Sequence, residues 1–304
     1  MEVDLFGEPI VKHEPLKDKF IVPPFSVIDT KQGDWQARKR KWKNLGIKSE
    51  LGRDAECLPS SFGGELDENG LDKYGRKPMS GTSIFDPVLC EVMYHWFCPN
   101  DGSILDPFAG GSVRGIVASH QGYKYTGIEL REEQVLSNRE QALEIIPSNI
   151  PNWIIGDSNK QLDLLPDNSF DFLFSCPPYH DLEIYSTLEE DLSAMDYYNF
   201  VLMYSSIINK SLRKLKNNSF AVFVIAEIRD KDGLYKNFLS DTKSAFIRNG
   251  ANFYNNIILL KALGTAMLRA KKIMEASRKV VAVHENVLVF YKGDPKQIKE
   301  KFKF

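Results

Sequence analysis

The stretch Phe172–Tyr179, which reads FLFSCPPY, joins a short apolar run to two consecutive prolines and an aromatic residue. Successive apolar residues are typical of a buried strand, and proline ends a strand because it has no N–H to donate and its φ is fixed. We therefore expect a rigid floor at Cys176, Pro177 and Pro178, with the flat face of Tyr179 beside it. Such a floor suits a planar ring, although the same residues are also compatible with a simple loop.

A glycine-containing loop, Pro107–Ser112, lies between a predicted strand at 103–106 and a predicted helix. Glycines in this position let a ligand approach the backbone closely, next to the N-terminus of the helix. A dinucleotide site would place a pyrophosphate there. The carboxylate of Asp106 precedes the loop and would repel a pyrophosphate, so the pattern favours a ligand that carries an ammonium group.

Carboxylates also end the next two predicted strands. Glu129 follows the strand 123–128, where α/β nucleotide sites hold ribose hydroxyls. Asp157 and Ser158 follow the strand 152–155, in a position to meet an exocyclic amine. Each carboxylate is also compatible with a helix N-cap. Three successive strand ends nevertheless offer groups for an amino acid, a ribose and an adenine, which together describe S-adenosylmethionine (SAM).

The elements that must position these residues alternate in kind from about residue 81. A helix is expected after Asp86-Pro87, since Asp is a good N-cap and Pro suits the first helical position. The predicted strands are 103–106, 123–128, 152–155, 170–175, 219–226, 252–260 and 286–291. The predicted helices are 112–120, 131–145, 195–215 and 234–249. This alternation indicates an α/β fold with a mainly parallel seven-stranded sheet, an antiparallel edge hairpin and helices on both faces.

Composition limits the possible classes of protein. The chain has 304 residues, 43% of them hydrophobic, which is enough for a sizeable α/β core. The formal net charge is −2, so any contact with nucleic acid must come from a local basic surface. The four cysteines form no CxxC pair, so we expect no metal site and no disulfide framework. Without a signal peptide or a long apolar run, we expect a cytoplasmic protein with no membrane contact.

A basic run lies upstream of these motifs. A short helix is expected over Trp35–Trp42, with Asp34 as its N-cap. Its basic side chains could bind phosphates while a tryptophan stacks on a base. The alternative is a solvated helix face with Trp42 packed against the rest of the protein. The candidate phosphate ligands in this run are Arg38, Arg40 and Lys41.

Six sequence motifs together resemble the SAM-dependent DNA amino-methyltransferases. DPFAGGS, GIEL, GDS and SCPPY look like motifs I to IV of that family, GTSIFDP is similar to its motif X, and HENVLVFYK resembles its last hairpin strand. The resemblance covers about residues 81–292, and the pairing of DPFAGG with SCPPY is specific. With the block GDWQARKRKW, the pattern also looks like phage and prophage methylases of restriction-modification type. It implies a Rossmann-like class I methyltransferase fold.

The resemblance implies SAM as the cofactor and a role for each matching residue. Residues of motif I would surround the methionine part, Glu129 would take the ribose, and motif X would close over the cofactor. The implied cofactor-binding residues are Ser83, Ile84, Phe85, Asp106, Phe108, Ala109, Gly110, Glu129, Leu130, Asp157 and Ser158. The implied catalytic residues are Ser175, Cys176, Pro177, Pro178 and Tyr179.

The implied reaction methylates the exocyclic amine of a cytosine (N4) or an adenine (N6) in double-stranded DNA. The base would leave the duplex, at a cost of a few kcal/mol, and stack on Tyr179. Acceptors at the strand end would then hold the hydrogens of the amine, whose lone pair is otherwise delocalised into the ring. The methyl transfers in line without a covalent enzyme intermediate, so most of the catalysis is positioning.

Cys176 departs from the family pattern, because this position is usually Asp, Asn or Ser. A thiol is a weak acceptor, which leaves the target base open. One alternative is methylation of a cytosine ring carbon with Cys176 as the nucleophile, for which Glu285-Asn286-Val287 spells a matching signature after the wrong strand. The chain is also compatible with an RNA or small-molecule methyltransferase, and with an inactive regulator that binds SAM or DNA.

The resemblance also suggests a division of the chain. Residues 1–80 would be an extension that contacts DNA or a partner. Residues 81–295 would form the methyltransferase domain, with a DNA-facing insertion at 262–280, and residues 296–304 would be a basic tail. The protein would act as a monomer or homodimer in the cytoplasm of a bacterial or phage-infected cell. Further candidate DNA contacts are His180, Arg269, Lys271, Lys272 and Arg278.

Overall fold

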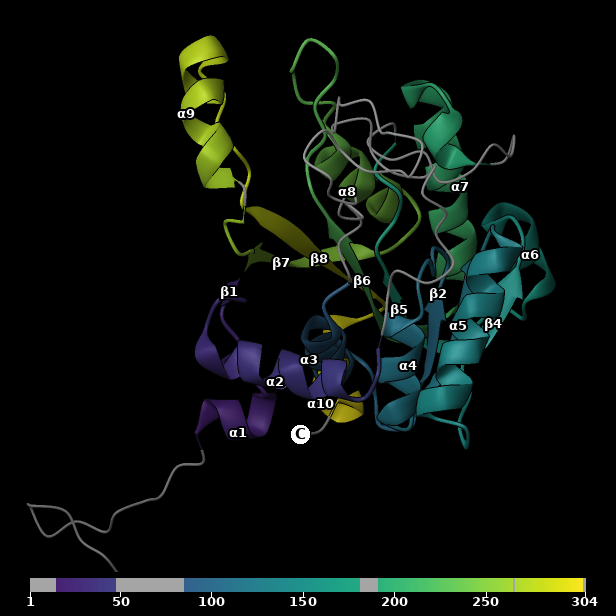
Figure 1. The fold of residues 1–304 in the computed structure, drawn as a ribbon. Helices are drawn as coiled ribbons and strands as arrows, with labels where there is room; N and C mark the ends of the chain where they lie inside the picture. Colours follow the sequence, from purple (N-terminus) through teal and green to yellow (C-terminus); the bar gives the residue numbers. More distant parts are fainter. Residues whose placement is uncertain (1–14, 48–84, 181–190, 265, 303–304) are drawn as a thin grey trace, which may run out of the picture.

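The computed structural model describes residues 15–47, 85–180, 191–264 and 266–302. Within them, a sheet of eight strands forms the centre of the protein, in the order β1-β7-β8-β6-β5-β2-β3-β4 (Figure 1). Neighbouring strands are parallel except at β8, which is antiparallel to both β6 and β7. The strands are β1 (Val27–Asp29), β2 (Ser103–Asp106), β3 (Lys124–Glu129), β4 (Asn152–Ile155), β5 (Phe170–Ser175), β6 (Leu215–Ile225), β7 (Asn252–Leu260) and β8 (His284–Lys292).

Seven of these strands follow the topology of class I methyltransferases, which confirms the predicted Rossmann-like fold. Their order across the sheet places the first of the seven, β2, in the interior between β5 and β3, and the last one, β8, between β7 and β6. The eighth strand, β1, was not predicted. It lies beside β7 at the edge, and the Thr30 hydroxyl that follows it donates a hydrogen bond to the carbonyl of Leu260 (2.7 Å). Three residues are too few to show a period, so this strand depends on its pairing with β7.

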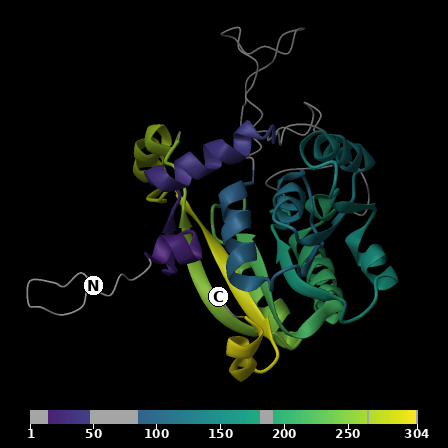
Figure 2. The ribbon, with the colours of Figure 1, turned by 90° about the horizontal axis from the view of Figure 1, so that it is seen from below.

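Helices cover both faces of the sheet, as predicted (Figures 1 and 2). Successive residues of a strand point to opposite faces, so Phe172 and Phe174 of β5 belong to one buried cluster and Leu173 to the other. The first cluster is covered by α3 (Pro87–Phe97), α4 (Val113–His120) and α5 (Glu132–Ile145). The second is covered by α6 (Ser158–Leu164), α7 (Tyr197–Lys214) and α8 (Phe238–Arg248). The smaller helices are α1 (Leu16–Phe20), α2 (Gly33–Asn44), α9 (Ala266–Ser277) and α10 (Ile298–Lys301).

The predicted helix at 35–42 is α2, but its N-cap is Gln32 and not Asp34, which lies within the first turn. Both of its tryptophans are buried, which confirms that Trp42 packs against the body of the protein. The indole N–H of Trp42 donates to Glu91 of α3 (3.0 Å). Arg38 donates to the same carboxylate through Nε and Nη2, both at 2.6 Å. The described part of the predicted N-terminal extension is therefore built into the fold rather than separate from it.

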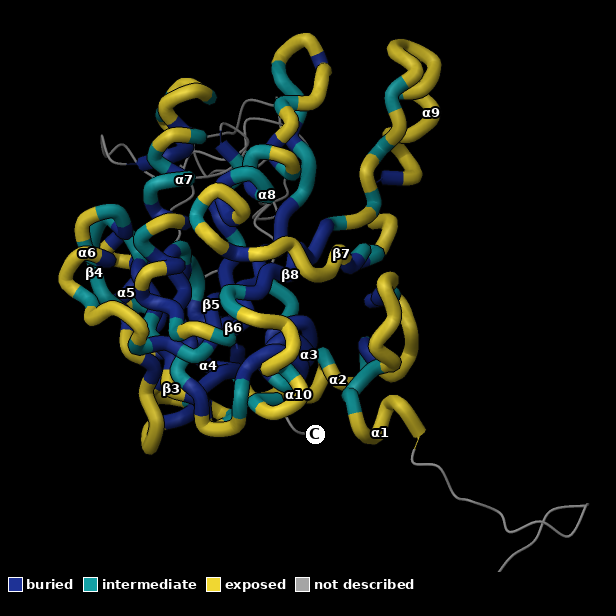
Figure 3. The backbone as a smooth tube through the Cα atoms, turned by 180° about the vertical axis from the view of Figure 1, so that it is seen from behind, coloured by how far each residue is buried: buried dark blue, intermediate teal, exposed yellow. Residues whose placement is uncertain are grey.

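The basic segment between β7 and β8 forms the helix α9, which stands out from the sheet (Figure 1). Most of its residues are exposed (Figure 3), and Leu268 has 83% of its surface accessible. Among the described residues, no helix combines the length and the apolar character that crossing a membrane requires.

Candidate active site

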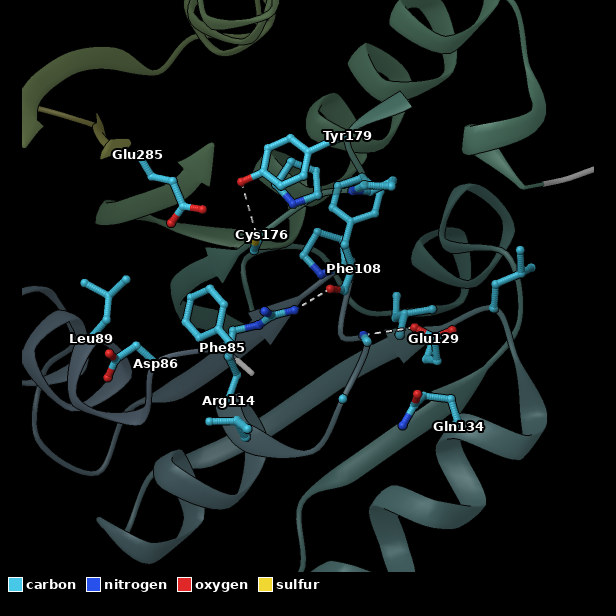
Figure 4. Close-up of a pocket in the computed structure, with 18 of the residues that line it drawn as sticks. Phe85, Asp86, Leu89, Phe108, Arg114, Glu129, Gln134, Cys176, Tyr179 and Glu285 are labelled. Carbon is cyan, nitrogen blue, oxygen red and sulfur yellow. Dashed lines mark hydrogen bonds between the residues drawn. The ribbon is translucent and has the colours of Figure 1, made fainter. Parts of the chain in front are cut away.

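A cavity of about 710 Å³ opens at the carboxyl ends of the parallel strands (Figure 4). Its wall combines the glycine loop after β2, the end of β3, the turn after β4 and the Pro-Pro-Tyr segment after β5. The fold therefore brings together motifs that lie far apart in the sequence. The predicted site residues that line it are Phe85, Phe108, Gly110, Glu129, Leu130, Asp157, Ser158, Cys176, Pro177, Pro178 and Tyr179. Ser83 and Ile84 lie outside the described residues.

The glycine loop is held open towards the cavity by hydrogen bonds on both sides. Gly110 has φ +52°, in the left-handed region that favours glycine, and a Cβ built there would meet no atom within 4 Å. Its N–H donates to Glu129 Oε2 (2.9 Å), and its carbonyl accepts from Asn138 (2.8 Å). Glu129 Oε1 accepts from the N–H of Arg131 (3.0 Å). The loop and the carboxylate at the end of β3 thus form one rigid cradle.

The turn after β4 is fixed in a similar way. The Asp157 side chain caps α6, since it accepts from the N–H of Asn159 (2.8 Å), and it also lines the cavity. Ser158 is buried and donates its hydroxyl hydrogen to the carbonyl of Pro107, in the glycine loop. This bond ties the ends of β2 and β4 together. Asp157 is therefore both a helix cap and a cavity residue. The sequence was compatible with either role.

Asp106 does not face the cavity, which corrects the expectation that it meets an ammonium group. Its side chain is fully buried and does not line the cavity. Oδ2 accepts from Arg114 Nε (2.6 Å) and from the Tyr125 hydroxyl (2.7 Å), and Oδ1 accepts from the Ser175 hydroxyl (2.5 Å). The carboxylate is thus surrounded by donors of the protein itself. Ser175 is buried as well and likewise does not line the cavity.

Arg114 of α4 is the partner that sequence reasoning missed. Its Nη2 donates to the carbonyls of Phe108 (2.5 Å) and Ala109 (2.9 Å), and its guanidinium lies over the Phe85 ring at 4.7 Å from the centroid. Burial lowers the pKa of Arg114, but the negative charge of Asp106, its hydrogen bond and the nearby Tyr125 and Cys176 together outweigh this and raise the pKa. The signal in the sequence is a single charged residue early in the apolar helix VRGIVASH. Arg114 shapes the loop and lines the cavity.

Cys176 lies on the cavity floor, half-buried, with Sγ 3.8 Å from the Tyr179 hydroxyl. Burial raises the pKa of the thiol to about 11, and the nearby positive charge of Arg114 only partly opposes this. The thiol is therefore neutral near pH 7. A nucleophilic cysteine needs a thiolate, so this environment argues against the ring-carbon mechanism.

We expect Cys176 to react slowly with iodoacetamide at pH 7 to 8, because almost none of a thiol with a pKa of about 11 is ionised there. The rate should rise about tenfold per pH unit towards that pKa. The measurement is peptide mass spectrometry of the Cys176 peptide after timed labelling of the native protein, with free cysteine as the reference. Labelling at pH 7 as fast as that of free cysteine would contradict the assigned environment.

His180 follows Tyr179 but turns into the protein, so the predicted contact of His180 with DNA is wrong. Its backbone has φ +48°, and only 4% of its surface is exposed. The ring packs edge-on against Tyr197 (5.4 Å) and Phe200 (5.2 Å), and Nδ1 lies 2.8 Å from Nζ of Lys236. The histidine fastens the Pro-Pro-Tyr segment to α7.

The predicted basic contacts fall into two groups. Arg38 is paired with Glu91 and serves the packing of α2. Arg40 and Lys41 are exposed on α2, while Arg269, Lys271, Lys272 and Arg278 are exposed on or just after α9, and these six stay predictions. Within the described chain, the cavity is also lined by the cations Lys39, Lys43 and Lys261, besides Arg114 and Arg131. Lys39 and Lys43 belong to the basic run predicted to bind phosphates, whereas Lys261 was not predicted. Within the described residues, no group of three His, Cys, Asp or Glu side chains could hold a metal ion.

No family model and no curated protein sequence matches this chain. Solved structures of similar fold include TrmN from Thermus thermophilus, with 13% identity and a TM-score of 0.46. The match covers 68% of this chain and 49% of TrmN, so this chain spans about half the length of TrmN. Magnesium protoporphyrin IX methyltransferase from Synechocystis PCC 6803, solved with bound SAM, has 11% identity, a TM-score of 0.41, and coverage of 68% and 76%. A candidate DNA modification methylase, also from Thermus thermophilus, has 19% identity, a TM-score of 0.35, and coverage of 49% and 57%.

Proposed function

We propose that this protein is a SAM-dependent DNA methyltransferase that modifies the exocyclic amino group of a flipped cytosine (N4) or adenine (N6). The observation that carries the proposal is the shared cavity: the Pro177-Pro178-Tyr179 floor lies on the same cavity as Gly110 and Glu129. One part of this cavity suits a nucleoside cofactor, and the other suits a planar ring.

The cofactor is SAM, which supplies an electrophilic methyl group on a sulfonium. The carboxylate of Glu129 is placed to accept hydrogen bonds from ribose hydroxyls, while Asp157 offers an acceptor for an adenine amine. The open side of Gly110 lets a ligand approach the backbone. Phe85 and Phe108 add aromatic walls, which favour a positively charged sulfonium.

The floor after β5 suits an amino group as the methyl acceptor. Neither Pro177 nor Pro178 has an N–H, so the backbone here offers carbonyl acceptors without competing donors. Such acceptors can hold the hydrogens of an amine and make its lone pair available. Tyr179 supplies the aromatic face on which a flipped base would stack.

The support for DNA as the substrate comes from local positive charge. The whole chain cannot supply it, because its formal net charge is −2. Lys39 and Lys43 line the cavity, and α9, which follows β7 and carries exposed cations, stands out from the sheet (Figure 1). A surface of this kind can hold the phosphates that flank a flipped nucleotide. The two helices α2 and α9 would then contact the backbone of the duplex.

The decisive experiment is mass spectrometry of nucleosides from DNA isolated after expression, compared with DNA from cells that express the Tyr179→Ala variant. N4-methylcytosine or N6-methyladenine that depends on Tyr179 is the expected result. 5-Methylcytosine would instead indicate the ring-carbon mechanism. Methylated nucleosides in tRNA or rRNA, with none in DNA, would assign the protein to RNA, and SAM binding without any methylated product would indicate a regulator.

Replacing Glu129 by alanine is expected to weaken SAM binding by about 10- to 100-fold. Hydrogen bonds to a charged acceptor contribute about 1.5–3 kcal/mol, and each 1.4 kcal/mol is about tenfold in affinity. The variant also removes the acceptor for the Gly110 N–H. Isothermal titration calorimetry with SAM measures the effect. Glu140→Gln on the exposed side of α5 is the control, and an equal loss in both variants would contradict the assigned role.

A further inference from the structure

The cavity holds a carboxylate that does not belong to the Pro-Pro-Tyr motif. Glu285 lies in β8 and lines the cavity together with Cys176. Figure 4 shows its side chain on the same side of the cavity as Cys176 and Tyr179, away from Glu129. At the position of Cys176 the resembled methyltransferases have a good acceptor, whereas a thiol is a weak one. The carboxylate of Glu285 therefore lies beside the position at which the motif lacks a strong hydrogen-bond acceptor.

Strand geometry explains why these two residues share one wall. Cys176 comes two residues after Phe174, and Glu285 comes two residues before Val287. Phe174 and Val287 belong to the same buried cluster, so both side chains point to the same face of the sheet. β6 separates β5 from β8, so the two strands lie about 10 Å apart. A base that sits on the floor at Cys176 would have its amino edge within reach of Glu285.

Lys261 at the end of β7 orients the carboxylate. Its Nζ lies 2.5 Å from Glu285 Oε1. Among the described residues, Oε2 makes no hydrogen bond. The Glu285 side chain is 19% exposed, so it is partly withdrawn from solvent and yet open to the cavity. One oxygen is thus anchored, and the other is available to a ligand.

We propose that Glu285 is a catalytic residue that accepts a hydrogen of the target amine in place of the weak acceptor Cys176. This inference rests on the proposed function and deepens it. A bond forms between the amine nitrogen and the methyl carbon while the carbon–sulfur bond breaks, and its electron pair stays on sulfur. The nitrogen then releases a proton to the carboxylate of Glu285, which passes it to water.

The test compares Glu285→Ala with Lys261→Ala, because both remove the same ion pair but only the first removes the acceptor. Methyl transfer to DNA is measured in a single turnover, and SAM affinity is measured by calorimetry. We expect Glu285→Ala to lower the rate by about 100-fold, in the range of general-base catalysis. Lys261→Ala should lose less than about tenfold, since the carboxylate remains. SAM affinity should stay within about twofold in both variants, because Glu285 lies away from Glu129.

A second variant separates catalysis from packing. Cys176→Asp restores a strong acceptor on the floor, so in the Glu285→Ala background it should recover at least about tenfold of the rate. Equal losses in Glu285→Ala and Lys261→Ala without this rescue, or a wild-type rate in Glu285→Ala, would overturn the role of Glu285. A wild-type protein that methylates RNA and not DNA would refute the proposed substrate instead, and the same comparison would then be made on that RNA.

Discussion

The Asp106→Asn variant is expected to lose about 3–5 kcal/mol of unfolding free energy, because it leaves the Arg114 guanidinium as a buried charge without a partner. Asp106 is fully buried, and its two oxygens accept hydrogen bonds from Arg114, Tyr125 and Ser175. These donors come from α4, β3 and β5, so the loss should affect the whole central sheet. Urea denaturation followed by tryptophan fluorescence measures the effect.

A double variant makes this prediction specific. Removing both charges in Asp106→Asn/Arg114→Met should cost less than Asp106→Asn alone, because no buried charge then remains unpaired. Asp163→Asn, which breaks an exposed ion pair with Lys210 (2.6 Å), is the control and should leave the urea midpoint nearly unchanged. If the double variant is less stable than the single one, the buried charge is not the cause. SAM binding should fall with Asp106→Asn, since Arg114 holds the carbonyls of Phe108 and Ala109.

Tyr179→Ala is expected to lower methyl transfer to DNA by about 5- to 150-fold while SAM affinity stays unchanged. Stacking of a base on an aromatic side chain contributes about 1–3 kcal/mol, which corresponds to this range. Tyr179 lines the cavity, and its ring packs edge-on against Phe238 at 6.4 Å. The measurement is the single-turnover rate with saturating SAM.

Two controls accompany this second prediction. Tyr179→Phe keeps the ring and should retain most of the rate, although it loses the contact of the hydroxyl with Cys176 Sγ at 3.8 Å. Tyr198→Ala removes a tyrosine that is 72% exposed on α7 and should have no effect. A Tyr179→Ala variant as active as wild type would exclude stacking on this residue, whereas a Tyr179→Phe variant as impaired as Tyr179→Ala would assign the effect to the hydroxyl.

Local sequence patterns were sufficient to predict most of the elements and the motifs at the strand ends. Apolar runs such as 170–175 and periodic spacing such as 195–215 depend only on near neighbours in the chain, and both appear in the structure as β5 and α7. The short elements β1 and α6 were not predicted. β1 has three residues and α6 has seven, which are too few to establish a period of hydrophobic residues. Their stability comes from pairing with β7 and packing on α7.

The FLFSCPPY stretch shows where the sequence stops being sufficient. By itself it determined a strand that ends in a rigid floor beside an aromatic face, because proline chemistry is local. Tertiary structure decided that Asp106 turns inward to Arg114, that His180 is buried, and that Glu285 faces the cavity shared with Cys176. Each of these outcomes depends on a contact between distant segments, set by strand order and side-chain direction. A residue type shows which chemistry is possible, and only the fold brings together the groups that carry it out.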